Sequence, residues 1–418
     1  MHEFAENESA REAVSDSVRR WEMPHKILVV DDEPDLEILI TQKFRKRIRE
    51  RDLDFVFAGN GQEALAKLES NGGMDVVLTD INMPVMDGLT LLSNLRQHHP
   101  MLRSVIVSAY GDMSNIRMAL NRGAFDFITK PIDLRDLEIT LDKTIREAVA
   151  QKEAAADRER LLSIQKELDV AREIQESIVP REFPPFPERE DVSIHATMLP
   201  ANEVGGDFFD FFLIDSDRIG FAIGDVSGKG VPAALFMAVS RTLLRATASR
   251  GFSPDECMMQ MNQSLHQESI SSMFVTCFYG VLNTRTGELQ CSNGGHNLPY
   301  ILHADGRLET MEPCGGLILG AFKNAAYEKG QFALRPGDCI FLYTDGITEA
   351  MNQDGEQFSP ERLANSLRRV NGSRVEDIVG DVVGNVKAFT AGAPQSDDMT
   401  ILAIRYEGNG HTPANETR

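Results

Sequence analysis

The sequence has no long apolar run, no cysteine pair at metal-binding spacing and no excess of basic residues. Its first apolar run, residues 27–30, is far too short for a signal peptide or a membrane span. The net charge of −21 argues against nucleic acid as the main partner, because phosphate backbones bind Lys and Arg. We therefore expect a soluble, cytoplasmic protein with no targeting signal, no membrane segment and no nucleic-acid partner.

Cysteine is scarce, and its pattern excludes several classes of protein. The five cysteines are odd in number and show no CxxC spacing, which favours reduced packing residues over a zinc site or a disulfide framework. A length of 418 residues with 42% hydrophobic and 26% charged residues is typical of two or three globular domains. We expect loose tails at residues 1–24 and 408–418.

Residues 25–148 alternate short apolar segments with helical patterns. Strands are expected at 26–30, 55–59, 74–80, 104–110 and 125–131, with helices at 34–48 and 61–70 among those between them. Alternation of this kind predicts an α/β doubly wound, five-stranded parallel sheet, whose sites form at the carboxyl ends of the strands. The polar residues at those predicted ends are Asp31, Asp32, Asp80, Ser108 and Lys130.

These residue types indicate phosphoryl chemistry. Three crowded carboxylates repel one another and favour a cation between them, and their hard oxygen ligands suit Mg²⁺. An Asp carboxylate beside Mg²⁺ can act as a nucleophile and become an acyl phosphate. Lys130 would offer a positive charge to the phosphoryl group, and Ser108 would offer a hydroxyl.

The runs VVDDEPD, LTDINMPVMDG, IVSAYGD and FDFITKPID resemble the receiver domain of bacterial response regulators. The resemblance implies a phosphoryl-accepting Asp80 and a sensor histidine kinase as the donor. It also implies a cis peptide bond at Lys130–Pro131. Mg²⁺ would be held by Asp31, Asp32, Asp80 and the backbone carbonyl of Asn82. The switch and phosphate-contact roles would go to Ser108, Phe127 and Lys130.

A change of pattern follows the receiver-like segment. Residues 149–185 are interpreted as a helical, coiled-coil-like linker, ended by the prolines of VPREFPPFPERE. Its phase slips by one residue near position 161, and a solvated spacer helix is the alternative. A coiled-coil seam would make the protein a homodimer through this linker. The seam positions are Leu161, Ile164, Leu168, Ala171, Gln175 and Ile178.

Residues 190–407 are rich in strands, with helical patterns at about 232–249, 254–269 and 360–389, which suggests an α+β sandwich flanked by helices. Acids end several of its strands: Asp207, Asp225, Asp345, and Asp397 with Asp398. A single Asp-Gly after a strand is usually a turn, but four such acids in one domain favour a shared metal centre. Two divalent cations would offset the buried like charges and activate a bridging water.

The runs EVGGDFFDFF, IGDVSGKGVPAALFM, CSNGGHNLPY, LYTDGITEA and SDDMTILAIR resemble the metal-dependent PPM-type serine/threonine phosphatases. The resemblance is to the bacterial branch that controls sporulation and stress sigma factors. It implies two Mn²⁺ or Mg²⁺ ions. Their ligands would be Asp207, Asp225, the carbonyl of Val226, Asp345 and Asp397, with Asp398 the weaker member of its pair.

Two of these runs differ from signatures known in related or similar enzymes. GGDFF also resembles the start of a diguanylate cyclase signature, but Phe208 replaces the second acid that cyclases need. The run DVSG lacks the histidine that eukaryotic phosphatases carry beside their second metal-binding Asp. His296 is one alternative for the missing proton donor, and an ordinary turn histidine is the other.

Together these patterns predict a two-component response regulator in which phosphorylation of Asp80 controls a phosphoserine/phosphothreonine protein phosphatase. The implied substrate is a phosphorylated anti-sigma-factor antagonist in a partner-switching pathway. The alternative is a catalytically silent phosphatase fold that binds partners as a phosphorylation-gated adaptor. Loss of metal-binding acids would mark such an adaptor, and all four are present.

Overall fold

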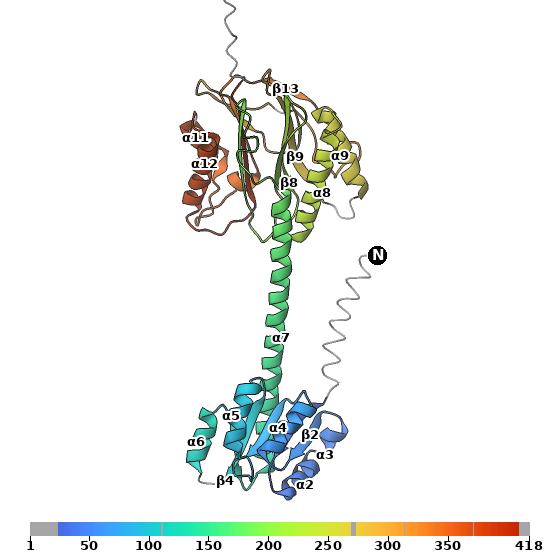
Figure 1. Cartoon of the computed structure of the whole chain (residues 1–418), viewed down its shortest axis with the longest axis vertical. Coiled ribbons are helices and arrows are strands. Elements are labelled where there is room, and N and C mark those ends of the chain that lie inside the picture. The colour runs from blue at the N-terminus through green and yellow to red at the C-terminus, as the bar shows by residue number, and fades with distance from the viewer. Residues whose placement is uncertain (1–23, 110–111, 269–272, 313, 371, 409–418) are drawn as a thin grey trace, which may run out of the picture. The chain divides into compact units, whose positions relative to one another are not determined.

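The computed structural model describes residues 24–109, 112–268, 273–312, 314–370 and 372–408. The chain forms two units whose boundary falls between Ser163 and Ile164, inside helix α7 (Leu134–Ile178) (Figure 1). The two expected tails lie outside the described residues, except for Pro24 and Gly408. Across the described ranges, no helix combines the length and apolar character needed to cross a membrane.

The first unit contains the predicted five-stranded parallel sheet, in the order β2-β1-β3-β4-β5. Its strands are β1 (His25–Val30), β2 (Leu53–Ala58), β3 (Val76–Asp80), β4 (Arg103–Ala109) and β5 (Asp126–Lys130). The helices that precede α7 are α2 (Pro34–Lys43), α3 (Arg45–Arg49), α4 (Gly61–Ser70), α5 (Gly88–His98) and α6 (Met113–Asn121).

Both faces of this sheet are buried, because successive residues of each strand point to opposite sides. Along β1, Ile27 and Val29 join a core with α2 and the start of α7, while Leu28 and Val30 join a core with α4 and α5. The helix expected at 34–48 is interrupted at Phe44, which leaves helical geometry at φ −98° and ψ 11° with its ring fully buried.

The second unit contains two antiparallel sheets, ordered β13-β10-β9-β8-β7 and β12-β11-β14-β15-β6. The first consists of β7 (Phe208–Leu213), β8 (Arg218–Val226), β9 (Val275–Asn283), β10 (Glu288–Gly294) and β13 (Gly330–Ala333). The second consists of β6 (Val192–Leu199), β11 (Tyr300–Leu302), β12 (Leu308–Thr310), β14 (Cys339–Tyr343) and β15 (Met399–Tyr406).

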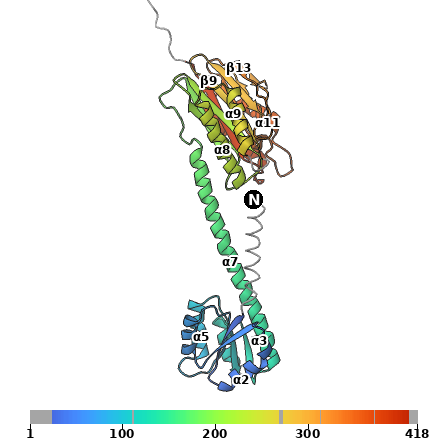
Figure 2. The same ribbon diagram turned by 90° about the vertical axis from the view of Figure 1, so that its right-hand side faces the viewer.

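Helices cover both outer faces of this sandwich (Figures 1 and 2). Helices α8 (Val231–Ala248) and α9 (Pro254–Glu268) pack on the first sheet, and α11 (Ser359–Arg369) and α12 (Val375–Thr390) pack on the second. A third core fills the space between the sheets, with Phe221 from one and Leu402 from the other. The helical region expected at 360–389 is thus two helices, separated by a turn in which Gly372 has a φ of +89°.

Candidate metal centres and phosphorylation site

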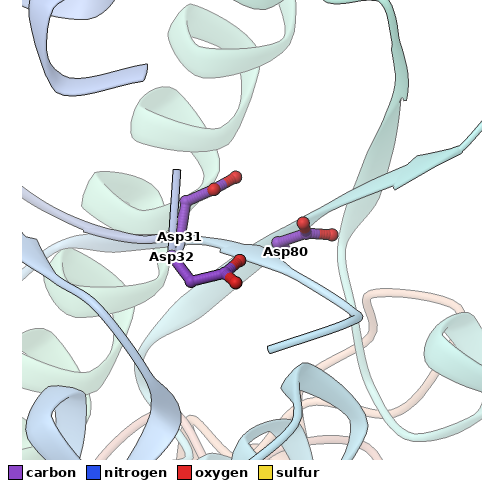
Figure 3. Close-up of side chains that lie close together, drawn as sticks. All are labelled: Asp31, Asp32 and Asp80. Atoms are coloured by element: carbon purple, nitrogen blue, oxygen red, sulfur yellow. The ribbon is translucent and has the colours of Figure 1, made fainter. Parts of the chain in front are cut away.

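The structure brings Asp31, Asp32 and Asp80 together, as the sequence predicted (Figure 3). The first two follow β1 and the third ends β3, and these strands are parallel neighbours, so their carboxyl ends meet. One oxygen from each side chain lies within 4.8 Å of the others; among the residues that the structure describes, no other acid, His or Cys group meets this criterion. Such a set of crowded carboxylates fits a hard divalent cation.

Lys130 offsets part of this negative charge. Its Nζ lies 2.7 Å from Asp80 Oδ2, 3.2 Å from Asp31 Oδ2 and 3.1 Å from Glu33 Oε1. Partial burial works to lower the pKa of Lys130, but the ion pairs with Asp80 and Glu33 outweigh it and raise that pKa. Glu33 was not among the predicted site residues, although it directly follows Asp31 and Asp32 in the sequence. The Lys130–Pro131 peptide is cis, as the resemblance implied.

The expected switch residues lie around the same strand ends. Ser108 is buried at the end of β4, and its Oγ has no hydrogen-bond partner among the described atoms. Phe127, on the adjacent β5, is half-buried against the core formed with α5 and α6. Asp80 Oδ1 accepts hydrogen bonds from the backbone N–H groups of Ile81 at 2.6 Å and Asn82 at 3.4 Å. The Ser108 hydroxyl is therefore free to donate to a new group.

In the second unit, the four predicted acids influence one another electrostatically. Burial, followed by the charges of Asp345 and Asp397, raises the pKa of Asp225 to about 7. Burial and the charges of Asp225 and Asp398 raise the pKa of the fully buried Asp207. These residues come from four separate segments, and the fold gathers them into one looser acid cluster, in which no three of the described carboxylates have oxygens that all lie within 4.8 Å of one another. Such a cluster suits cations better than isolated carboxylates do.

Neighbouring residues hold Asp207 in place. Thr344 Oγ1 donates a hydrogen bond to Asp207 Oδ2 at 2.7 Å and accepts one from the backbone N–H of Thr400 at 2.9 Å. Asp345 begins the short helix α10 (Asp345–Thr348), directly after Thr344. The pKa of Asp345 is raised by burial and by the charges of Glu349 and Asp397. Glu349 was not among the predicted residues, and its place in the sequence TDGITEA gave no signal of its own.

Asp397 and Asp398 differ clearly in their surroundings. Both oxygens of Asp398 accept backbone hydrogen bonds, from Ala201 N–H at 2.8 Å and Gly206 N–H at 2.7 Å. Asp398 therefore fastens the β6–β7 loop (residues 200–207). Asp397 is more exposed, and its Oδ2 lies 3.1 Å from Lys229 Nζ. This difference favours Asp397 as the ligand of the pair.

The structure also places Val226 and His296. A Cβ atom on Gly206 would lie 2.8 Å from the Val226 carbonyl oxygen, so this carbonyl faces the turn that precedes Asp207. His296 is buried, its Nδ1 lies 2.9 Å from Thr276 Oγ1, and burial lowers the pKa of its imidazole to about 4. A neutral, buried imidazole favours the turn role over the proton-donor role at neutral pH.

Two comparisons with sequence families agree with this geometry. Residues 27–142 match the sequence model of the response regulator receiver domain, and residues 215–407 match that of stage II sporulation protein E (SpoIIE). The chain therefore combines an N-terminal receiver domain with a C-terminal phosphatase domain of the SpoIIE type.

Two curated relatives each match more than half of this chain. Protein IcfG of Synechocystis is 30% identical over 57% of this chain, which spans only 41% of that relative. Phosphoserine phosphatase RsbU of Bacillus subtilis is 26% identical over 64% of this chain and 78% of its own length. The SiaA-PP2C domain of Pseudomonas aeruginosa, at 22% identity, shares the fold with a TM-score of 0.52 over 59% of this chain and 98% of that domain.

Proposed function

We propose that the chain is a metal-dependent phosphoserine/phosphothreonine protein phosphatase controlled by phosphorylation of Asp80. One observation carries the catalytic part: Asp207, Asp225, Asp345 and Asp397, far apart in sequence, form one cluster whose charges act on one another. The name of the RsbU relative, a phosphoserine phosphatase, supports the substrate class. Two Mn²⁺ or Mg²⁺ ions held by this cluster would activate a water and offset charge on the phosphoryl group.

The protein's own residues would orient and hold the reacting groups. Thr344 fixes the rotamer of Asp207, and Asp398 holds the β6–β7 loop that carries Asp207. Lys229, half-exposed at the edge of the cluster, offers an ammonium group that can bind a substrate phosphate. It would supply a cationic contact to the substrate phosphate.

The receiver domain supports the regulatory part of the proposal. Mg²⁺ at Asp31, Asp32 and Asp80, with the Asn82 carbonyl, would allow Asp80 to accept a phosphoryl group from a sensor histidine kinase. Ser108, Lys130 and Phe127 would respond to the new charge. The expected substrate is a phosphorylated anti-sigma-factor antagonist.

Helix α7 is the proposed relay and dimer element. Several of its apolar side chains are exposed: Leu161, Leu162, Ile164, Val170 and Ile174. Of these, Leu161 and Ile164 lie three residues apart at predicted seam positions, and their exposure favours pairing with a second copy through a coiled coil. Light scattering on the full chain, compared with a variant carrying Leu161→Lys and Ile164→Lys, would measure this dimer.

The deciding experiment is hydrolysis of a phosphorylated antagonist domain in Mn²⁺, with and without beryllofluoride as a mimic of phosphorylated Asp80. We expect a metal-dependent rate that changes with the mimic and is lost in Asp225→Ala. The matched control is Asp354→Ala, which removes an exposed loop carboxylate. Equal rates for the parent and Asp225→Ala would contradict the enzyme and leave the phosphorylation-gated adaptor.

A further inference from the structure

Two cysteines lie with their sulfur atoms in contact in the core between the two sheets of the second unit. The Sγ atoms of Cys291 and Cys314 are 3.4 Å apart. Cys291 lies on β10 and is fully buried, and Cys314, which follows β12 in the chain, is 5% exposed. Neither is in a disulfide, since all five cysteines are free. A disulfide bond is about 2 Å long, so a small movement of the two side chains would bring the sulfurs to bonding distance.

Backbone contacts hold the two cysteines beside each other. The N–H of Asn293, two residues after Cys291 on β10, donates to the carbonyl of Cys314 at 3.2 Å. Cys291 also lies opposite Gly330 in the pairing of β10 with β13. A Cβ atom on Gly330 would lie 3.0 Å from Cys314 Cβ and 3.1 Å from Cys291 Sγ, so the missing side chain leaves the space that the two thiols occupy. The position of the pair is therefore set by the main chain.

The two thiols differ in acidity and in access. The hydrogen bond with the Cys291 thiol lowers the pKa of Cys314, against the opposing effect of burial, and the same contact raises the pKa of Cys291. Burial raises the pKa of the other cysteines, which are Cys257, Cys277 and Cys339. Because the thiolate is the form that reacts with oxidants, Cys314, the more exposed member of its pair, should react first.

We propose that Cys291 and Cys314 are a modification site at which a hydroperoxide forms a reversible disulfide. The Cys314 thiolate attacks one oxygen of hydrogen peroxide and breaks the O–O bond, which leaves a sulfenic acid on Cys314 and releases the other oxygen, with a proton, as water. The Cys291 sulfur then attacks the Cys314 sulfur, and the hydroxyl group leaves with the Cys291 proton as a second water. Two electrons and two thiol protons pass to one peroxide molecule. No step involves the acid cluster, so this site is independent of the proposed function.

The disulfide would join β10 to the segment that leads back to β13. Beyond Cys314 this segment folds back on itself, because the N–H of Glu328 donates to the carbonyl of Gly315 at 2.9 Å. Within it, Leu319 pairs with Val275 at the start of β9. A crosslink between β10 and this segment restricts the unfolded chain and thereby stabilises the folded one. We therefore expect oxidation to raise the melting temperature of the second unit by about 5–10 °C.

The test uses the full chain, first reduced and then treated with hydrogen peroxide under native conditions. Remaining thiols are blocked with N-ethylmaleimide in denaturant, and the chain is digested with trypsin without reduction. Cleavage after Arg307 places Cys291 and Cys314 on separate peptides, residues 286–307 and 308–323. Mass spectrometry should find these two peptides linked to each other, N-ethylmaleimide on each of the other three cysteines, and complete reversal by dithiothreitol. Tyrosine circular dichroism would measure the melting temperature, because five of the six tyrosines belong to the second unit.

Serine variants identify the two sulfurs and the order in which they react. Cys291→Ser and Cys314→Ser should each form no linked peptides and show no rise in melting temperature with peroxide. Dimedone, which traps sulfenic acids, should label Cys314 in Cys291→Ser, where no second thiol can displace the hydroxyl group. Cys257→Ser, the same change at another buried cysteine, is the matched control and should form the linked peptides like the parent.

The parent chain alone can contradict the proposed disulfide, even if a serine variant fails to fold. Five free thiols after peroxide treatment would overturn it, as would a link to any other cysteine or a link that forms only in denaturant. Dimedone on Cys291 in Cys314→Ser, with none on Cys314 in Cys291→Ser, would overturn the assigned order of the two steps. An unchanged melting temperature in the oxidised parent would overturn the stabilising effect.

Discussion

Lys229 and Asp397 form an ion pair at the edge of the acid cluster, with Nζ 3.1 Å from Oδ2. Both side chains are substantially exposed, so the pair itself adds little stability and Lys229 can exchange Asp397 for a substrate phosphate. We expect Lys229→Met to raise KM for a phosphopeptide roughly tenfold, the loss of one charge-assisted hydrogen bond. Lys323→Met, at an exposed site, is the control. Steady-state kinetics in saturating Mn²⁺ would show the effect, and an unchanged KM would remove Lys229 from substrate binding.

Gly205→Ala tests the close approach of the β6–β7 loop to Asp398. The new Cβ would meet all three carboxylate atoms of Asp398 at 2.2–2.9 Å, so either the loop or the carboxylate must move. We expect loss of Mn²⁺-dependent activity together with a lower melting temperature. Gly380→Ala, on the exposed side of α12 with open space around it, should instead raise stability by about 0.5–1 kcal/mol. Parent-like activity in Gly205→Ala would show that the loop tolerates displacement.

Lys130→Met tests the receiver site. Its ammonium group contacts Asp80 and Asp31, and in the phosphorylated chain it would contact the phosphoryl oxygens. We expect acetyl phosphate to label the parent, to label Lys130→Met at least tenfold more weakly, and not to label Asp80→Asn. A loss of labelling of tenfold or more corresponds to about 1.4 kcal/mol or more. Lys143→Met, which removes an exposed α7 ion pair with Asp126, should be labelled like the parent. Phosphate-affinity gels would measure the labelling of the parent and the three variants. Labelling of Asp80→Asn would show that the phosphoryl group is carried by another residue.

Asp75→Asn tests how the start of α7 is tied to the receiver sheet. Burial works to raise the pKa of Asp75, but hydrogen bonds from His25, Lys152 and the Lys26 N–H outweigh it and lower the pKa to about 2. Because this folded-state pKa lies below the unfolded value, the stabilisation is complete above about pH 4 and is lost as pH falls toward 2.

The variant should therefore destabilise the first unit by about 2 kcal/mol at pH 7, and by progressively less below pH 4. Hydrogen exchange at β1 and β3, followed from pH 7 to pH 3, would measure both values. Asp157→Asn, at an exposed α7 position, should show no such pH dependence. A constant difference across this range would mean that Asp75 contributes packing and not charge.

The parallel sheet and its acid-bearing edge were predictable because they follow from local pattern. Runs such as KILVV are apolar on both faces and end in Asp, so strand, burial and site coincide within a few residues. The short strands β12 and β13 have three and four residues, too few to carry a periodic signal in the sequence. They form through pairing with β11 and β10.

The parts of the site that could not be predicted depend on contacts between segments far apart in the sequence. Thr344 reaches Asp207 across 137 positions, and no spacing rule connects them. Gln175 was placed in a coiled-coil seam because its position fits the helical period. The structure shows it buried against Gly205 instead. A periodic pattern identifies the buried face of a helix but not the residues that pack against that face.

The raised pKa of Asp225 makes protons competitors of divalent cations for the same carboxylate. At a pH below about 7 the proton is bound first, so loading the cluster releases acid and becomes harder as the medium acidifies. A fall of one pH unit near neutrality would thus reduce cation occupancy. The rate of hydrolysis would then depend on pH as well as on the phosphorylation of Asp80.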